Sequence, residues 1–397
     1  MKSQDQRKAA KNPLESLHDH GQAVWLDFLA RRFITEGGLK KLVEGDGLTG
    51  VTSNPTIFNK AIAGSADYDS SLKTAGDFDI MTLYERLAIE DIQHAADVLR
   101  PAYEATKRAD GYVSLEVSPY LAMSTEATVA EARRLSNAVS RDNVMIKVPA
   151  TKPGLPAIRQ LIGEGINVNI TLLFSQQVYE EVVEAYLAGV EHLVAQGGDP
   201  SKIASVASFF VSRIDQSVDK LIDECLRQTN DADKRADLTG LRGKIAIANA
   251  KLAYQRYKRL FAGARWEKLR AEGARVQRLL WASTGTKNPA YSDVFYVEGL
   301  IAPETISTMP PATMDAFRDH GRVQPTLEEN IEQARQVMAT LEKSGISIDS
   351  VTAKLVEEGV QIFANAFDKL LDAVARKRVA LLGEKLDSQN DQASWGA

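Results

Sequence analysis

The sequence predicts an α/β fold, namely a (β/α)8 TIM barrel with extra helices. Short apolar segments alternate with longer helical patterns along most of the 397 residues, which indicates parallel strands joined by crossover helices. Eight such segments favour a closed barrel over an open doubly wound sheet. No Gly-x-Gly-x-x-Gly motif follows the first of them, which argues against a dinucleotide-binding sheet.

The predicted elements follow one another in a regular order. The strands are AVWLDFL (23–29), LTGVTSNP (48–55), YVSLEVSP (112–119), NVMIKVPAT (143–151), INVNITLLFS (166–175), IASVASFFVSR (203–213), RLLWAST (278–284) and VFYVEGL (294–300). Between most of them, helical patterns span 81–108, 125–140, 154–164, 176–196 and 241–262. This alternation is what a barrel of parallel strands requires.

The chain is longer than a barrel alone, which needs roughly 250 residues. We expect one domain, 1–397, with the surplus in three places. These are an N-terminal arm (1–20), a polar insertion (227–244) with the helix that follows it, and helical segments from about 326 onward. We expect the C-terminal helices to pack on the outside of the barrel.

Composition excludes several classes of protein. The net charge is −5 without a basic stripe, so a nucleic-acid partner is not expected. Cys225 is the single cysteine and no metal-type Cys/His spacing occurs, so neither a disulfide nor a metal is predicted. No run of about 18 apolar residues could span a membrane, and the polar N-terminus lacks a signal-type apolar segment. A cytoplasmic location is therefore predicted.

Strand parity places polar side chains on one face of several strands, because successive side chains point to opposite sides. The apolar faces can be covered by the outer helices, so the polar faces must point into the barrel. The residues expected to point inward are Asp27 with Trp25, Gly50 with Thr52 and Asn54, Ser114 with Glu116, Asn143 with Met145 and Lys147, and Asn167 with Asn169 and Thr171. A barrel interior is normally apolar, and active sites form at the C-terminal ends of the strands.

An inward lysine suggests a specific chemistry. In a confined apolar site the ammonium form is disfavoured, so the Lys147 amine becomes available to attack a ketone and form a Schiff base. The imine then acts as an electron sink for cleavage of the neighbouring C–C bond. Asp27 and Glu116 are carboxylates of the type needed for the proton transfers. This chemistry needs neither a metal nor an organic cofactor.

Three motifs resemble those of the transaldolase family. GVTSNPTIF (50–58) resembles its second-strand signature, NVMIKVPAT its Schiff-base lysine signature, and EGINVNITLLFS (164–175) the strand that follows. The resemblance runs from about 22 to 320, and the extended C-terminal part looks like the longer transaldolases of some bacteria. It implies a circularly permuted barrel of the class I aldolase type.

The resemblance also implies roles for individual residues. Lys147 would be the nucleophile, Asp27 the acid/base for C–C cleavage, Glu116 a group acting through a water, and Thr171 the holder of that water. The substrate-binding residues would be Asn54 and Asn169 for the dihydroxyacetone hydroxyls, and Ser208 and Arg213 in SFFVSR for a phosphate. An arginine fork suits a phosphate well.

One segment departs from the family pattern. Shorter relatives carry an Ala-Ser-x-Arg-like phosphate ligand after the seventh strand, whereas this chain has WASTGTKNP (281–289), without an arginine. Ser283 fits the serine of the pattern, and Lys287 could supply the charge, without the bidentate geometry of arginine. Trp281 shares the inward parity of Ser283, so it would either line the pocket or pack in the core.

The sequence thus predicts a transaldolase of the pentose phosphate pathway. It would transfer dihydroxyacetone from sedoheptulose 7-phosphate or fructose 6-phosphate to glyceraldehyde 3-phosphate or erythrose 4-phosphate. Two alternatives stay open: a fructose-6-phosphate aldolase-like enzyme that releases free dihydroxyacetone, and a non-catalytic barrel that binds sugar phosphates. The sequence does not decide the preferred donor or whether the protein is a monomer or a homodimer.

Overall fold

A closed barrel of eight parallel strands forms the centre of the computed structural model, which describes residues 12–74 and 76–393. Residues 1–11 of the predicted N-terminal arm lie outside this description. Each strand pairs with the next in chain order, and the last pairs with the first. The strands are β1 (Gln22–Leu26), β2 (Leu48–Val51), β3 (Tyr112–Glu116), β4 (Val144–Pro149), β5 (Val168–Leu173), β6 (Ser205–Phe210), β7 (Arg278–Ala282) and β8 (Thr305–Met309). The predicted (β/α)8 fold class is confirmed.

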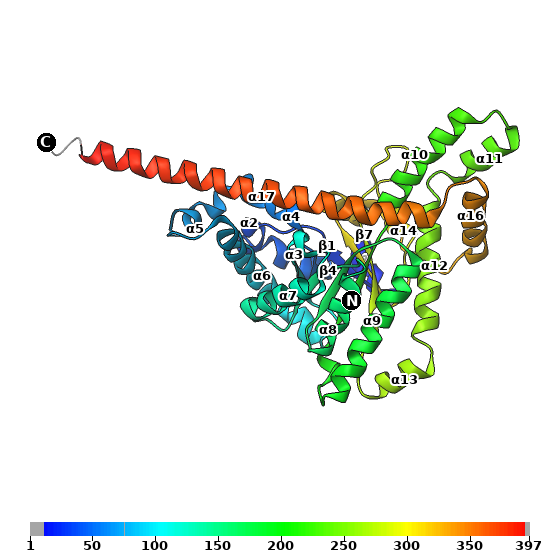
Figure 1. Ribbon diagram of the computed structural model, residues 1–397, viewed down its shortest axis with the longest axis horizontal. Coiled ribbons are helices and arrows are strands. Elements are labelled where there is room, and N and C mark those ends of the chain that lie inside the picture. Colours follow the sequence, from blue (N-terminus) through cyan, green and yellow to red (C-terminus); the bar gives the residue numbers. More distant parts are fainter. Residues whose placement is uncertain (1–11, 75, 394–397) are drawn as a thin grey trace, which may run out of the picture.

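Helices surround the barrel (Figure 1). The α-helices are, in chain order, α1 (Pro13–Asp19), α2 (Arg31–Thr35), α3 (Gly38–Gly45), α4 (Pro55–Ala63), α5 (Asp69–Thr74), α6 (Ile80–Ala105), α7 (Thr125–Val139), α8 (Gly154–Gly163), α9 (Gln176–Ala195), α10 (Ser212–Gln228), α11 (Ala232–Leu241), α12 (Ile245–Leu260), α13 (Ala264–Ala271), α14 (Phe295–Glu298), α15 (Pro311–His320), α16 (Ile331–Lys343) and α17 (Ile348–Ala393). Short 3-10 turns occupy η1 (Ala66–Tyr68), η2 (Pro119–Leu121) and η3 (Pro200–Lys202). In the described ranges, no helix is both long and apolar enough to cross a membrane.

The first seven predicted strands and the five predicted helices are found close to their predicted places. The eighth predicted strand, 294–300, is wrong. This segment contains the one-turn helix α14, and Val294, Val297 and Leu300 are buried at the three-residue spacing of a helix, together with Tyr296. The true eighth strand has the sequence TISTM, which contains three hydroxyl residues and only two apolar ones. Its low apolar content gives no strand signal in the sequence.

The polar insertion and the C-terminal segments are helical, and the described part of the N-terminal arm contains α1. The polar segment 227–244 contains the end of α10 and the whole of α11, and α12 follows it. Helix α16 packs on α12. Helix α17 differs from the expectation of an outer helix, because it contacts β5 and also α4 and α10, which follow β2 and β6. It therefore crosses the end of the barrel where the strands finish, and it continues beyond the barrel (Figure 1).

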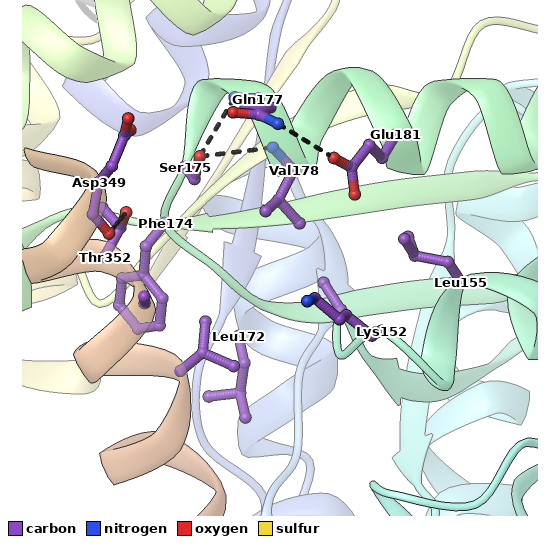
Figure 2. A pocket seen from close by; sticks show the side chains of 13 residues that line it. Lys152, Leu155, Leu172, Phe174, Ser175, Gln177, Val178, Glu181, Asp349 and Thr352 are labelled. Carbon is purple, nitrogen blue, oxygen red and sulfur yellow. Dashed lines mark hydrogen bonds between the residues drawn. The ribbon is translucent and has the colours of Figure 1, made fainter.

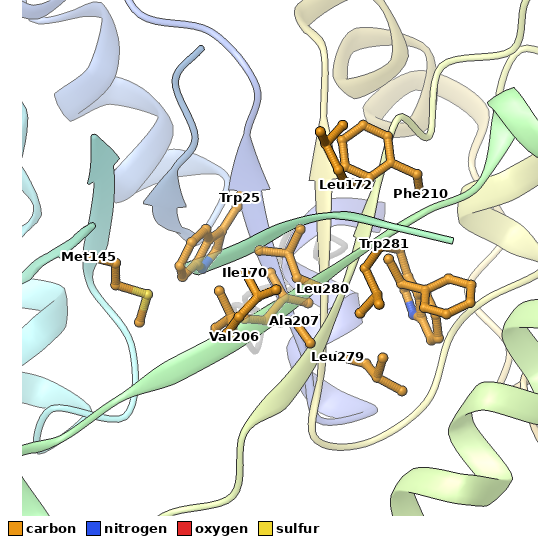
Figure 3. Packing of buried hydrophobic residues seen from close by; sticks show 14 of the residues in the cluster. Trp25, Met145, Ile170, Leu172, Val206, Ala207, Phe210, Leu279, Leu280 and Trp281 are labelled. Carbon is orange, nitrogen blue, oxygen red and sulfur yellow. The ribbon is translucent and has the colours of Figure 1, made fainter. Parts of the chain in front are cut away.

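The interior of the barrel is filled by large side chains below the polar end. Trp25 is fully buried, and its indole Nε1 donates a hydrogen bond of 2.8 Å to Asp110 Oδ1. Gly50 on the neighbouring strand leaves the room that this indole needs, because a Cβ atom there would lie 2.2 Å from Trp25 Cε2. Figure 3 shows Trp25 within the buried hydrophobic cluster, which also includes Met145 and Val206.

We predict that Gly50→Ala lowers the free energy of unfolding by roughly 1–3 kcal/mol, the usual cost of overpacking a core. Gly45→Ala is the matched control, because no atom lies within 4 Å of the added methyl group. It should leave the free energy unchanged or raise it slightly. Urea titrations of the two variants and the wild type measure the difference. Equal stability of all three proteins would contradict the tight contact with Trp25.

Candidate active site

A polar cavity of about 90 Å³ lies at the C-terminal end of the barrel. Its lining comes from seven strands or the residues that follow them, and from helices α10 and α17. The lining residues are Asp27, Thr52, Asn54, Lys147, Thr171, Ser208, Phe210, Arg213, Ala282, Ser283, Thr308 and Phe363. Seven of the ten residues predicted for the site are therefore in one place: Asp27, Asn54, Lys147, Thr171, Ser208, Arg213 and Ser283.

Lys147 points into this cavity from β4 and is 4% exposed. Its ammonium nitrogen lies 3.3 Å from Glu116 Oε2 and 3.2 Å from the carbonyl oxygen of Ser53. The pairing of β3 with β4 sets Glu116 directly beside Lys147. Burial raises the pKa of the Glu116 carboxyl, and the charge of Lys147 offsets part of this rise. Glu116 is thus a stronger base than an exposed glutamate, at hydrogen-bond distance from the amine.

Asp27 faces the cavity from the residue after β1. Its Oδ1 accepts a hydrogen bond of 2.7 Å from the hydroxyl of Thr52, which also lies 3.0 Å from the hydroxyl of Thr308. Its backbone N–H donates to Met309 at the end of β8. These contacts fix the carboxylate at the cavity wall. One oxygen remains available to a ligand, since Thr52 occupies only Oδ1.

Two polar side chains have unused hydrogen-bonding capacity here. The Thr171 hydroxyl is fully buried and has no hydrogen-bond partner among the described residues. Asn54 caps helix α4, since its Oδ1 accepts a hydrogen bond of 3.0 Å from the N–H of Ile57. This leaves the amide N–H₂ of Asn54 for the cavity. Buried polar groups normally have partners, so the free Thr171 hydroxyl indicates a place for water or a ligand.

Asn169 lies one layer below the cavity and is not part of its lining. It is fully buried, its amide donates a 2.9 Å hydrogen bond to Ser114 Oγ, and its Oδ1 accepts a 2.6 Å hydrogen bond from Ser208 Oγ. In this arrangement Asn169 orients Ser208, which does line the cavity. Its predicted role as a direct substrate ligand stays a prediction.

Arg213 brings an unpaired positive charge to the site. It is the second residue of α10, and no carboxylate of the described residues lies within 4.0 Å of its guanidinium. The guanidinium instead contacts the rings of Phe210 and Phe363, at 5.3 and 6.0 Å from their centroids. Burial lowers the pKa of Arg213, and the negative charges of Asp27 and Glu116 offset part of this. A half-buried arginine without a counterion is a strong indication of an anionic ligand.

Ser283 and Lys287 lie in the loop after β7. Ser283 lines the cavity with a left-handed backbone (φ 57°), and its hydroxyl is 2.9 Å from that of Ser212. Lys287 is exposed and does not line the cavity. Its ammonium nitrogen nevertheless lies over Gly285, 3.8 Å from where a Cβ atom at that glycine would be. Lys287 thus places its charge over Gly285, which is two residues after Ser283. Its role in binding stays a prediction.

Several lining residues were not selected from the sequence. Thr308 belongs to the unrecognised strand β8, and Phe363 comes from α17, for which no pattern indicated contact with the site. Thr52 has the same strand parity as Asn54, and this pattern is sufficient to predict that Thr52 lines the cavity. Trp281 does not line the cavity, since it packs edge-on against Phe209 in the core at 6.1 Å. Ser283 has a left-handed backbone, so the alternation of side chains along β7 does not extend to it. Trp281 and Ser283 therefore do not share a face.

The comparisons with known proteins agree with one another. The chain matches the family model described as transaldolase/fructose-6-phosphate aldolase over residues 24–374. It is 48% identical to a protein named "Transaldolase" from Trichodesmium erythraeum over 92% of this chain and 97% of the relative. It is 47% identical to "Transaldolase 1" of Streptomyces avermitilis (95% and 97%) and 46% identical to "Transaldolase" of Thermobifida fusca (93% and 99%). Similarity therefore extends over the barrel and most of α17.

We predict that Arg213→Ala weakens the binding of inorganic phosphate roughly tenfold or more, because a charge-assisted hydrogen bond contributes about 1.5–3 kcal/mol. Arg227→Ala is the control, since Arg227 is an exposed arginine near the other end of the same helix and does not line the cavity. Isothermal titration calorimetry measures both affinities. Similar losses in the two variants would show that phosphate binds by general surface charge and not in the cavity.

Proposed function

The chain belongs to the transaldolase/fructose-6-phosphate aldolase family, and we propose that it is a transaldolase, an enzyme of the transferase class, in which Lys147 carries the transferred three-carbon unit. The observation that supports this most strongly is the convergence of a buried lysine and an uncompensated arginine on one cavity. The amine suits a ketone, and the guanidinium suits a phosphate. A ketose phosphate presents both groups.

The reaction would begin with attack of the Lys147 amine on the keto carbon of the donor. The ammonium group must first lose a proton, and Glu116 is the base beside it. The same carboxyl can then return a proton when the carbinolamine loses water and the imine forms. The free hydroxyl of Thr171 would hold the water that is released.

Cleavage would follow at the bond between the third and fourth carbons of the donor. Asp27 takes the proton of the hydroxyl on the fourth carbon, so that this carbon leaves as an aldehyde. The bonding electrons move into the imine, which becomes an enamine attached to Lys147. An acceptor aldehyde then binds, the enamine carbon attacks it, Asp27 returns its proton to the new hydroxyl, and hydrolysis of the imine releases the new ketose.

The substrates would be those expected from the sequence: sedoheptulose 7-phosphate or fructose 6-phosphate as donors, and glyceraldehyde 3-phosphate or erythrose 4-phosphate as acceptors. Arg213 and Ser283 would bind the phosphate, with Lys287 as a further cation at the loop. Asn54, and Asn169 through Ser208, would fix the hydroxyls of the dihydroxyacetone unit. This assignment places the reaction in the pentose phosphate pathway and, as part of the same proposal, in the cytoplasm.

The family description covers both transaldolases and fructose-6-phosphate aldolases. The three relatives named above all carry the name of the transferring enzyme, and each is matched over more than nine-tenths of its length. We therefore favour transfer over release of free dihydroxyacetone. Measurement of dihydroxyacetone release from fructose 6-phosphate without an acceptor distinguishes the two activities, because a transferase should release it slowly.

We predict that borohydride reduction in the presence of fructose 6-phosphate attaches one reduced dihydroxyacetone unit to the protein. Peptide mapping should locate it on Lys147, and Lys147→Ala should lose both the adduct and all turnover, because Lys147 is the only lysine among the described residues that line the cavity. Lys152→Ala, which removes an exposed lysine five residues away, is the control and should retain the adduct. A well-folded wild-type protein without an adduct would refute the proposed Schiff base.

A second prediction separates cleavage from imine formation. Asp27→Asn should slow turnover roughly 100-fold or more, the usual contribution of an acid/base group. The borohydride adduct should still form, now with the whole donor sugar retained, because Asp27 does not contact Lys147 within ion-pair distance among the described residues. Intact mass spectrometry distinguishes the two adducts. Normal turnover of this variant would assign the cleavage step to another group.

A further inference from the structure

Helix α17 contacts the end of the barrel through one face. Gly359, Phe363 and Phe367 are spaced by four residues and therefore share a face of this helix. Gly359 allows a close approach, since a Cβ atom there would lie 2.7 Å from Leu172 Cδ2. Leu172, at the end of β5, has a left-handed backbone (φ 57°). Figure 2 shows Leu172 beside Phe174 on the side that faces α17.

Further contacts hold α17 in this position. Phe367 packs edge-on against Tyr84 at 5.4 Å and Tyr120 at 5.9 Å. Tyr120 also donates a hydrogen bond to Asp368. Near the far end of the contact, the ammonium group of Lys377 lies 3.0 Å from Asp69 Oδ1 and donates a 3.0 Å hydrogen bond to the carbonyl oxygen of Ile62. Together with the contact of Gly359 on the other side, these contacts fix the place of Phe363 over the barrel.

Phe363 closes the cavity that contains Lys147. It is 6% exposed, and its ring centroid lies 5.6 Å from Lys147 Nζ and 6.0 Å from the Arg213 guanidinium carbon. Both distances are within the range of cation–π attraction. In this position the ring is the apolar wall opposite the reactive amine.

A larger groove lies beyond this wall, between α10 and α17. Its volume is about 730 Å³, and Arg213 and Ile362 are among its lining residues. Arg213 borders both spaces, whereas Phe363 borders only the cavity and Ile362 only the groove. Ile362 is 46% exposed. The ring of Phe363 and the side chain of Arg213 therefore separate Lys147 from a space that is open to solvent.

The size of the cavity makes this wall important. About 90 Å³ holds a few water molecules, each of which occupies roughly 30 Å³ in the liquid. A six- or seven-carbon sugar phosphate needs more room, so the Phe363 ring must yield to admit a donor whose phosphate lies at Arg213 and Ser283. Once the aldehyde product has left, only the three-carbon unit on Lys147 remains, and the ring can close over it.

We propose that Phe363 is a specificity-determining residue that keeps solvent away from the three-carbon enamine, so that this enamine reacts with an acceptor aldehyde and is not released. This inference rests on the proposed transaldolase function. Release requires that the enamine carbon takes a proton, that water adds to the resulting imine carbon, and that the bond to Lys147 breaks to give dihydroxyacetone and the free amine. Transfer requires instead that the enamine carbon bonds to the acceptor. Both reactions begin from one intermediate, and only the first is favoured by entry of solvent.

The experiment compares release and transfer in variants of Phe363. Dihydroxyacetone release from fructose 6-phosphate is measured without an acceptor, and transfer is measured with glyceraldehyde 3-phosphate. For Phe363→Ala we expect the ratio of release to transfer to rise about tenfold. This is smaller than the roughly 100-fold or more by which a positioned acid or base can accelerate a proton transfer. Phe363→Leu should give an intermediate ratio, because leucine fills part of the space of the ring. Ile362→Ala, the neighbouring change on the groove side, should keep the wild-type ratio.

The ratio is insensitive to a general loss of activity, since both products come from the same enamine. If Phe363→Ala does not fold, Phe363→Leu decides the test alone, and a wild-type ratio in that variant overturns the inference. A wild-type ratio in a folded Phe363→Ala protein that still forms the borohydride adduct also overturns it, while the proposed function stands. Absence of the adduct in the wild type refutes the proposed function and the inference together.

Discussion

The site depends on the strand register that sets Glu116 beside Lys147. Two charged side chains in the interior of a barrel are costly to desolvate, and their mutual attraction repays this only when they are close. Parallel pairing of β3 with β4 brings them to 3.3 Å. The raised pKa of Glu116 follows from the same burial. One register thus both makes the buried lysine tolerable and supplies it with a proton acceptor.

Charge balance extends this arrangement across the cavity. Asp27 and Glu116 are the acids, and Lys147 and Arg213 are the cations, yet Lys147 and Glu116 form the one close pair of the four. Asp27 is held by hydroxyl groups and Arg213 by aromatic rings. These neutral partners fix both side chains without neutralising them. Asp27 and Arg213 therefore offer one carboxylate and one guanidinium, neither in an ion pair among the described residues, to a substrate with hydroxyl and phosphate groups.

The sequence was sufficient to predict the barrel and most of the site, because strand parity is a local property. Lys147, Asn54 and Thr171 were assigned to the interior from alternation within single strands, and all three line the cavity. Of the two places left open for Trp281, the structure shows the core, because Ser283 follows the end of β7 with a left-handed backbone and the two residues do not share a face. The hydroxyl-rich β8 lacks the apolar signal of a strand. Phe363 was out of reach for a different reason. Its place depends on how a distant helix packs over the barrel, and no local pattern encodes that contact.

The close approach of Gly359 to Leu172 couples two parts of the chain that are far apart in sequence. A larger residue at position 359 would push α17 away from β5. The ring of Phe363, one helical turn later, would move with the helix. Such a change becomes tolerable only when position 172 becomes smaller at the same time. Natural variants of this protein should therefore change positions 359 and 172 together. The shape of the catalytic chamber depends on both residues and not on either one alone.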